Sequence, residues 1–138
     1  MLQPIITFLM IIATGTLQLE SQTVLDRVVD SMHMSHEHAD LRCKWAYSTI
    51  AILVLMVGHV LQVTIWGLWY YAWGDLGSLR NCLYFSLASF TTVGANDLEL
   101  KPWHRMAGAV EAGIGMLMFG WSTALLVDII QRARQLRQ

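Results

Sequence analysis

The segment Thr91–Asp97, which reads TTVGAND, concentrates polar side chains and a glycine in a chain that is otherwise largely apolar. A short run, RNCLYFSLASF at residues 80–90, comes directly before it. Backbone that leaves the helical form at membrane depth is stable only where protein buries it or where it lines a water-filled path. Carbonyl oxygens that line such a path can replace the water around a cation. The alternative is that residues 74–102 form a plain extracellular loop.

The distribution of charge predicts the apolar elements that would position this segment. The chain has 138 residues, of which 55% are hydrophobic and only 14% are charged. Residues 1–19 carry no charged side chain, and Glu111 is the single acid between Met106 and Val127. About 20 apolar residues are needed to cross the roughly 30 Å hydrocarbon core of a bilayer. Stretches 45–73 and 103–131 meet this requirement easily and residues 1–19 meet it narrowly, so the composition argues against a soluble protein.

Residues 1–19 predict an N-terminal membrane helix, with an interfacial amphipathic helix or a cleaved signal as the alternatives. We expect residues 20–44 to form a cytoplasmic polar linker and residues 132–138 a basic cytoplasmic tail. Basic residues favour the cytoplasmic side of a membrane. Six of the nine flank the spans on one side: Arg27, Arg42, Lys44, Arg132, Arg134 and Arg137. This leaves Arg80, Lys101 and Arg105 outside and places the C-terminus in the cytoplasm.

The run at residues 80–90 is too short to cross a membrane, because as a helix it measures about 16 Å at 1.5 Å per residue. The predicted order is therefore a span, a short helix, an irregular segment and a second span. One chain cannot enclose a water-filled path with a single short loop. Four copies around a symmetry axis can, since each loop then supplies a quarter of a ring of carbonyl oxygens. We therefore expect a homotetramer in the lipid bilayer.

Two stretches resemble a known family. SLASFTTVGANDL resembles the pore helix and signature of potassium-channel-type pore-loop ion channels, whose usual form is TTVGYGD. GIGMLMFGWSTALL resembles the inner helix of the same family, and the likeness covers roughly residues 45–131. More narrowly, the chain is similar to small bacterial ion-channel-like proteins with an extra N-terminal apolar segment. The resemblance implies a multi-pass protein of a bacterial inner membrane.

The fold class implied by the resemblance is an all-α membrane protein. Two transmembrane helices, the outer at 45–73 and the inner at 103–131, would flank a re-entrant pore helix at 80–90 and a filter at 91–97. The apolar segment at 1–19 would add the N-terminal membrane or interfacial helix.

The resemblance assigns the selectivity filter to Thr91, Thr92, Val93, Gly94, Ala95, Asn96 and Asp97. Thr92, Val93 and Gly94 match the usual signature, and in the family such a threonine hydroxyl and the following carbonyls coordinate the ion. Ala95 stands where the family has a tyrosine, so the ring that packs behind the filter is absent. Asn96 replaces the second glycine but tolerates a left-handed backbone. We expect weakened discrimination between potassium and sodium.

The inner helix carries further residues to which the resemblance gives roles. One helix face would line the pore cavity: Met116, Phe119, Thr123 and Val127. Gly115 and Gly120 would form a hinge. Glu111 is an acid within a span, and we expect it to support the filter by accepting hydrogen bonds from the pore helix or filter. The alternatives are a plain interfacial acid and an ion pair with Arg105 or Arg80.

On the second apolar stretch, His59 and Gln62 form a small polar patch. Such a patch at membrane depth predicts hydrogen bonds between helices, with proton sensing by the histidine as the alternative.

His33, His36 and His38 lie in a short histidine-rich tract between the first two apolar stretches. Imidazoles there could hold zinc, copper or nickel, although such tracts are common as plain polar linkers. The sequence offers no Ser/His/Asp arrangement, phosphate loop or carboxylate pair in a common site, so we expect no enzyme, no bound cofactor and no nucleic-acid partner. The expected function is a tetrameric cation channel that conducts K⁺ and Na⁺. The alternatives are a non-conducting channel-like scaffold or partner subunit, and a small metal transporter that uses the histidine tract.

Overall fold

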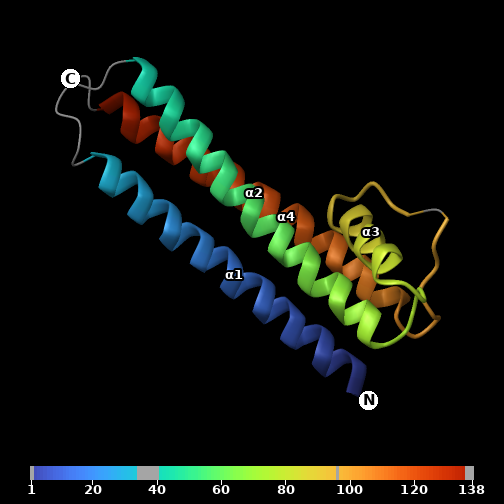
Figure 1. Ribbon diagram of the computed structural model, residues 1–138. Coiled ribbons are helices and arrows are strands. Elements are labelled where there is room, and N and C mark those ends of the chain that lie inside the picture. Colours follow the sequence, from blue (N-terminus) through green and yellow to red (C-terminus); the bar gives the residue numbers. More distant parts are fainter. Residues whose placement is uncertain (1, 34–40, 96, 136–138) are drawn as a thin grey trace.

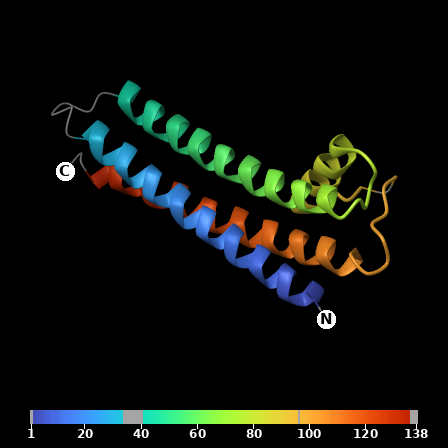
Figure 2. The same cartoon turned by 60° about the horizontal axis from the view of Figure 1, so that its bottom comes forward.

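The computed structural model describes residues 2–33, 41–95 and 97–135, and this part of the chain contains helices but no strand. The helices are α1 (Leu2–His33), α2 (Leu41–Ala72), α3 (Leu79–Phe90) and α4 (Arg105–Gln135). The long helices α1, α2 and α4 lie side by side, and the short α3 packs beside one end of α2 and α4 (Figures 1 and 2). The expected all-α class is confirmed.

Three helices are long and apolar enough to cross a membrane: Pro4–Val28, Ser48–Ala72 and Arg105–Gln131. The N-terminal end of α1 lies at the same end of the bundle as α3, whereas the C-terminal end of α4 lies at the opposite end (Figure 2). Consecutive long helices therefore run antiparallel. This is the arrangement that three successive membrane crossings require.

The helices extend beyond the predicted boundaries of the linker and of the tail. Helix α1 continues past residue 19 to His33, α2 already begins at Leu41, and α4 extends to Gln135. The physical reason for the long α1 is that residues 20–33 contain no glycine or proline to end a helix. Leu25 on this extension is buried in a cluster with Ala51, Leu55 and Ile129, so packing also holds the extension. Residues 34–40 of the predicted linker and 136–138 of the tail lie outside the described residues.

The main core lies where α3 meets α2 and α4. Trp66 and Tyr70 from α2, Cys82 and Phe90 from α3 and Ile114 from α4 are all buried in it. Large rings dominate, and neighbouring rings meet edge to face, as in the contact between Trp66 and the ring of Trp69 at 5.9 Å. This core fixes the position of α3 relative to the long helices.

Helix α1 is attached to the rest of the bundle by buried polar groups. Gln62 Nε2 on α2 donates to Gln18 Oε1 on α1 at 3.0 Å, and Gln18 Nε2 donates to Ser122 Oγ on α4 at 3.1 Å. Ser122 Oγ also lies 3.1 Å from His59 Nε2. Hydrogen bonds between helices are a recognised source of association inside membranes. The predicted interhelical hydrogen bonding of His59 and Gln62 is confirmed.

Candidate functional site

The short helix α3 is capped at both ends by local hydrogen bonds. Ser78 has an extended backbone, and its hydroxyl accepts from Asn81 N at 3.2 Å, which is the usual arrangement of an N-cap serine. At the other end, Thr91 N donates to Leu87 O at 3.0 Å. The helix has 12 residues, or about 18 Å at 1.5 Å per residue, and is too short to cross a membrane.

The backbone reverses its handedness directly after α3. Thr92 has a φ of 62° and Gly94 a φ of 81°, both in the left-handed region. Gly94 N donates back to Ala88 O at 3.0 Å, which ties the segment to the end of the helix. A left-handed conformation is rare for a β-branched residue such as threonine and persists only where the surroundings impose it. Residues 91–95 and 97 of the predicted filter thus form an irregular segment, whereas Asn96 lies outside the described residues.

Val93, between the two left-handed residues, is 78% exposed. No side chain of the described residues covers it, although Phe90 at the end of α3 is buried nearby in the sequence. The segment therefore presents apolar side-chain surface and irregular backbone outward from the chain.

Glu111 joins three helices at the level of α3. Its side chain is fully buried. Tyr70 on α2 donates its hydroxyl to Oε2 at 2.7 Å, and Ser86 on α3 lies 2.5 Å from Oε1. Arg105 instead forms an exposed ion pair with Glu99, at 2.7 Å. The structure therefore shows the expected hydrogen bond between Glu111 and the short helix, rather than the alternative pairing with Arg105.

The contacts of Ser86 determine how many protons this cluster holds. Its single hydroxyl lies within hydrogen-bond distance of two acceptors, Val63 O at 2.8 Å and Glu111 Oε1 at 2.5 Å. A serine hydroxyl donates only one proton. If Glu111 carries a proton, it donates to Ser86, and Ser86 then donates to Val63 O. Tyr70 supplies the third proton, so a neutral Glu111 satisfies every contact without burying a charge.

Gly115 allows α4 to approach the end of α3 closely. A Cβ at this position would overlap the carbonyl group of Phe90, the last residue of α3. A Cβ at Gly120 would meet no atom within 4 Å. The two glycines therefore differ in their surroundings: Gly115 is required for packing beside the irregular segment, and Gly120 is not. Their predicted role as a hinge stays a prediction.

The residues predicted to line a cavity lie on an exposed strip of α4. Met116, Phe119, Thr123 and Val127 are all exposed on the single chain. Phe119 also packs against Phe90, with ring centroids 5.5 Å apart, so the strip begins next to the end of α3. An apolar strip of this kind requires lipid or another protein surface to cover it.

A buried pair of side chains that sequence reasoning missed fixes the turn before α3. His104 Nδ1 lies 2.7 and 2.9 Å from the two carboxylate oxygens of Asp75, and both side chains are almost completely buried. Lys101 Nζ donates to Trp73 O at 3.0 Å. The ring of Trp69 packs 5.2 Å from the imidazole. Asp75 and His104 are 29 residues apart, and no local pattern in the sequence indicated that they pair.

Most of the histidine tract lies outside the described residues. His33 ends α1, whereas His36 and His38 lie outside the described residues. Within the described ranges there is no group of three metal-ligating side chains. Metal binding by the tract stays a prediction.

Comparison with known proteins gave one match. The sequence profile described as ion channel matches residues 49–132, from the early part of α2 through α3 and the irregular segment to the last turns of α4. No curated protein and no solved structure matches the chain. Because the match covers more than half of the chain and coincides with the short capped helix and the segment after it, the chain belongs to the pore-loop ion channel family.

Proposed function

We propose that four copies of this chain surround a pore and conduct monovalent cations with weak discrimination between K⁺ and Na⁺. Family membership makes the protein a membrane ion channel. One observation carries the finer proposal. The irregular segment after α3 is exposed, yet Gly94 N donates back to Ala88 O, and the buried Glu111 holds α3 itself through Ser86.

A single chain leaves surface exposed that several copies would cover. Val93 and the α4 strip from Met116 to Val127 are apolar and exposed. Irregular backbone at membrane depth requires protein or water around it. Placing four such segments around one axis covers the strips and provides rings of carbonyl oxygens to the ions. The re-entrant pore and the homotetramer are thus parts of the same proposal.

The selectivity follows from the residues of the segment. Thr92 and Val93 retain two contributors to the inner coordination sites, whereas Ala95 has no ring to support the outer part. With fewer rigid carbonyl rings, an ion stays partly hydrated, and the filter then discriminates less between potassium and sodium. Asp97 and Glu99 place carboxylates on the outer side of the segment, where they would attract cations and repel chloride, although the pairing of Glu99 with Arg105 reduces its share. The permeant ions K⁺ and Na⁺ are the only ligands that this mechanism requires.

The orientation completes the proposal. With the basic residues that flank the spans in the cytoplasm, the C-terminus is cytoplasmic and the α3 end of the bundle faces outward. A bacterial inner membrane is the proposed location.

The test is ion flux through purified protein in liposomes. We expect flux of K⁺ and Na⁺ within about one order of magnitude of each other and no flux of chloride. The variant Gly94→Ala, which places a side chain at a φ of 81°, should remove the flux, whereas Gly120→Ala, which meets open space, should retain it. A folded tetramer without flux of any cation would overturn the proposal and favour the non-conducting scaffold.

A further inference from the structure

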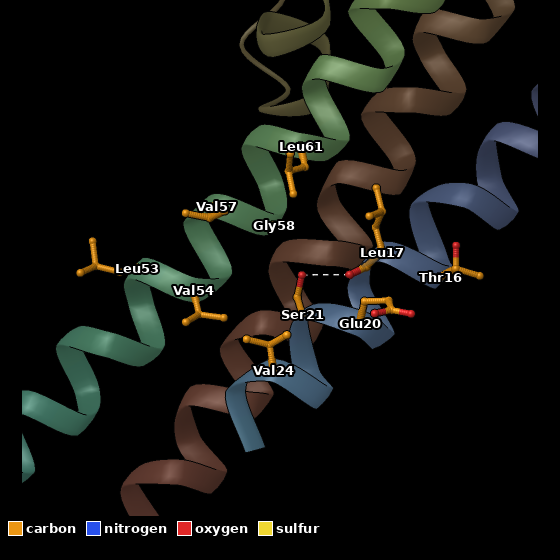
Figure 3. A pocket seen from close by; sticks show the side chains of 10 residues that line it. All are labelled: Thr16, Leu17, Glu20, Ser21, Val24, Leu53, Val54, Val57, Gly58 and Leu61. Atoms are coloured by element: carbon orange, nitrogen blue, oxygen red, sulfur yellow. Dashed lines mark hydrogen bonds between the residues drawn. The ribbon is translucent and has the colours of Figure 1, made fainter. Parts of the chain in front are cut away.

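A groove lies between the middle parts of α1 and α2, away from the predicted filter (Figure 3). Its volume is about 710 Å³, within the usual range for sites that hold small molecules. Leu17 and Val24 on one side and Leu53, Val57 and Leu61 on the other make its walls largely apolar. Several of these side chains are half exposed or more, so the groove is open on its outer side.

The groove lies at membrane depth. All of its lining residues belong to the candidate spans Pro4–Val28 and Ser48–Ala72. Glu20 lies about 6 Å from the middle of the first span, counting 1.5 Å per residue along the helix. A molecule would therefore enter this groove from the hydrocarbon of the bilayer rather than from water.

One polar group in the groove is left without a partner inside the protein. The hydroxyls of Thr16 and Ser21 donate to carbonyls of their own helix, at 2.9 Å in both cases. The carboxyl group of Glu20 is exposed, and it forms no hydrogen bond or ion pair with another described residue. An ionisable side chain inside a membrane span is costly and usually has a function.

Helix packing does not explain Glu20. Two other polar residues of α1, Thr14 and Gln18, are buried against the neighbouring helices and are bonded there. Thr14 accepts from Trp66 Nε1 at 3.1 Å, and Gln18 bonds to Gln62 and Ser122. Glu20 lies on a different face of α1, among the residues that line the groove.

We propose that this groove binds hydrophobic amines, with the ammonium group against Glu20 and the hydrocarbon chain along Leu53, Val57 and Leu61. The attraction between an ammonium and a carboxylate is much stronger in an apolar medium than in water. The chain of such a molecule stays in an apolar environment throughout, since it moves from the lipid to the apolar walls. The proposal rests on the membrane location of the two spans, and it does not depend on whether the protein conducts cations.

The experiment uses the full-length protein in liposomes and a decylamine probe with a photoreactive diazirine at the end of its chain. Labelled peptides are identified by mass spectrometry. The decanol analogue of the probe has the same chain without the charge and serves as the control for apolar partitioning. We expect the amine to label peptides from residues 16–24 and 53–61.

Three variants of the groove test the roles of charge and shape separately. Glu20→Gln should reduce labelling by the amine about tenfold, which corresponds to about 1.4 kcal/mol, and leave labelling by decanol unchanged. Glu20→Asp keeps the charge and should restore most of the labelling. Leu61→Trp fills the groove and should reduce labelling by both probes.

Two results would overturn the proposal. The first is that the amine labels the unmodified protein and Glu20→Gln equally. Labelling of α4 in place of the groove would count against the proposal in the same way. The second is a zero-length cross-link between Glu20 and a lysine of a neighbouring chain, because another copy would then cover the groove. Helical content measured for every variant separates a lost site from a lost fold, and Glu20→Asp and Leu61→Trp remain informative if Glu20→Gln does not fold.

Discussion

At the scale of single residues, Ala95 and Asn96 are the two departures from the usual filter signature. The double variant Ala95→Tyr with Asn96→Gly should raise the preference for K⁺ over Na⁺ about tenfold or more, because it restores the ring and the second glycine that support the outer carbonyls. Reversal potentials under ion replacement measure this preference. Ala95→Tyr alone is the matched control and should raise it less. If the unmodified protein already excludes sodium, these two residues do not set its selectivity.

Glu111 allows a second prediction at this scale, since a proton on its carboxyl group would satisfy all of its contacts. Glu111→Gln should retain flux and lose no more than about 1 kcal/mol of stability, because its amide can donate to Ser86 and accept from Tyr70. Glu111→Ala leaves both hydroxyls buried without this partner and should cost about 2–5 kcal/mol. Unfolding of the purified protein in detergent measures both values. An equal loss of stability in the two variants would mean that Glu111 is ionised.

At the scale of the elements, the contact between α4 and the end of α3 depends on Gly115. Gly115→Ala should displace Phe90 and the segment that follows it, because the new Cβ would overlap the Phe90 carbonyl group. We expect a change in both conductance and ion preference in single-channel records. Gly120→Ala is the matched control on the same helix, and any effect it has would report bending rather than packing. A change in open probability alone in Gly115→Ala would favour the hinge over the close approach.

The turn between α2 and α3 depends on another contact, that of Asp75 with His104. Asp75→Ala removes one partner of a buried pair and should destabilise the protein by about 3 kcal/mol or more. Glu99→Gln breaks the exposed pair with Arg105 and should cost less than about 1 kcal/mol. The midpoint of thermal unfolding compares the two variants directly. A similar small loss for both would show that the buried pair does not hold the turn.

These contacts also show which parts of the fold the sequence could predict. The apolar stretches, the charge between them and the signature at residues 91–97 predict helices and a pore-loop segment, because each is a local pattern. The end of α1 was missed because the polar residues after position 19 resemble a linker, although no residue there breaks a helix.

Contacts between residues far apart in the sequence were the other feature that the sequence could not predict. Glu111 was recognised as an unusual acid, and the short helix was among its expected partners, but the sequence did not distinguish Ser86 or Tyr70 within the fold. Asp75 and His104 were not paired at all. Local patterns of hydropathy specify which side chains are buried, whereas the partner of a buried polar group depends on how whole helices pack.

At the scale of the whole molecule, the exposed α4 strip predicts how the chains assemble. With Cys43 and Cys82 replaced by alanine, Thr123→Cys should form disulfides or short cross-links between copies, since four such strips would face one axis. Leu53→Cys, which lies in the groove between α1 and α2, is the control and should not cross-link. Native mass measurement in detergent should give the mass of four chains. A monomer or dimer as the largest species would contradict the proposed assembly.

The bond from Gln18 to Ser122 has a consequence for how the chain is made. Helices α1 and α2 emerge from the ribosome before α4. Gln18 can therefore bond to Gln62 before Ser122 has been added to the chain. Until the last helix enters the membrane, Gln18 Nε2 and His59 Nε2 lack the partner that they share in the finished protein. Polar groups without partners are unfavourable in lipid. A chain whose synthesis stops before α4 therefore carries unpaired polar groups of Gln18 and His59 within the bilayer.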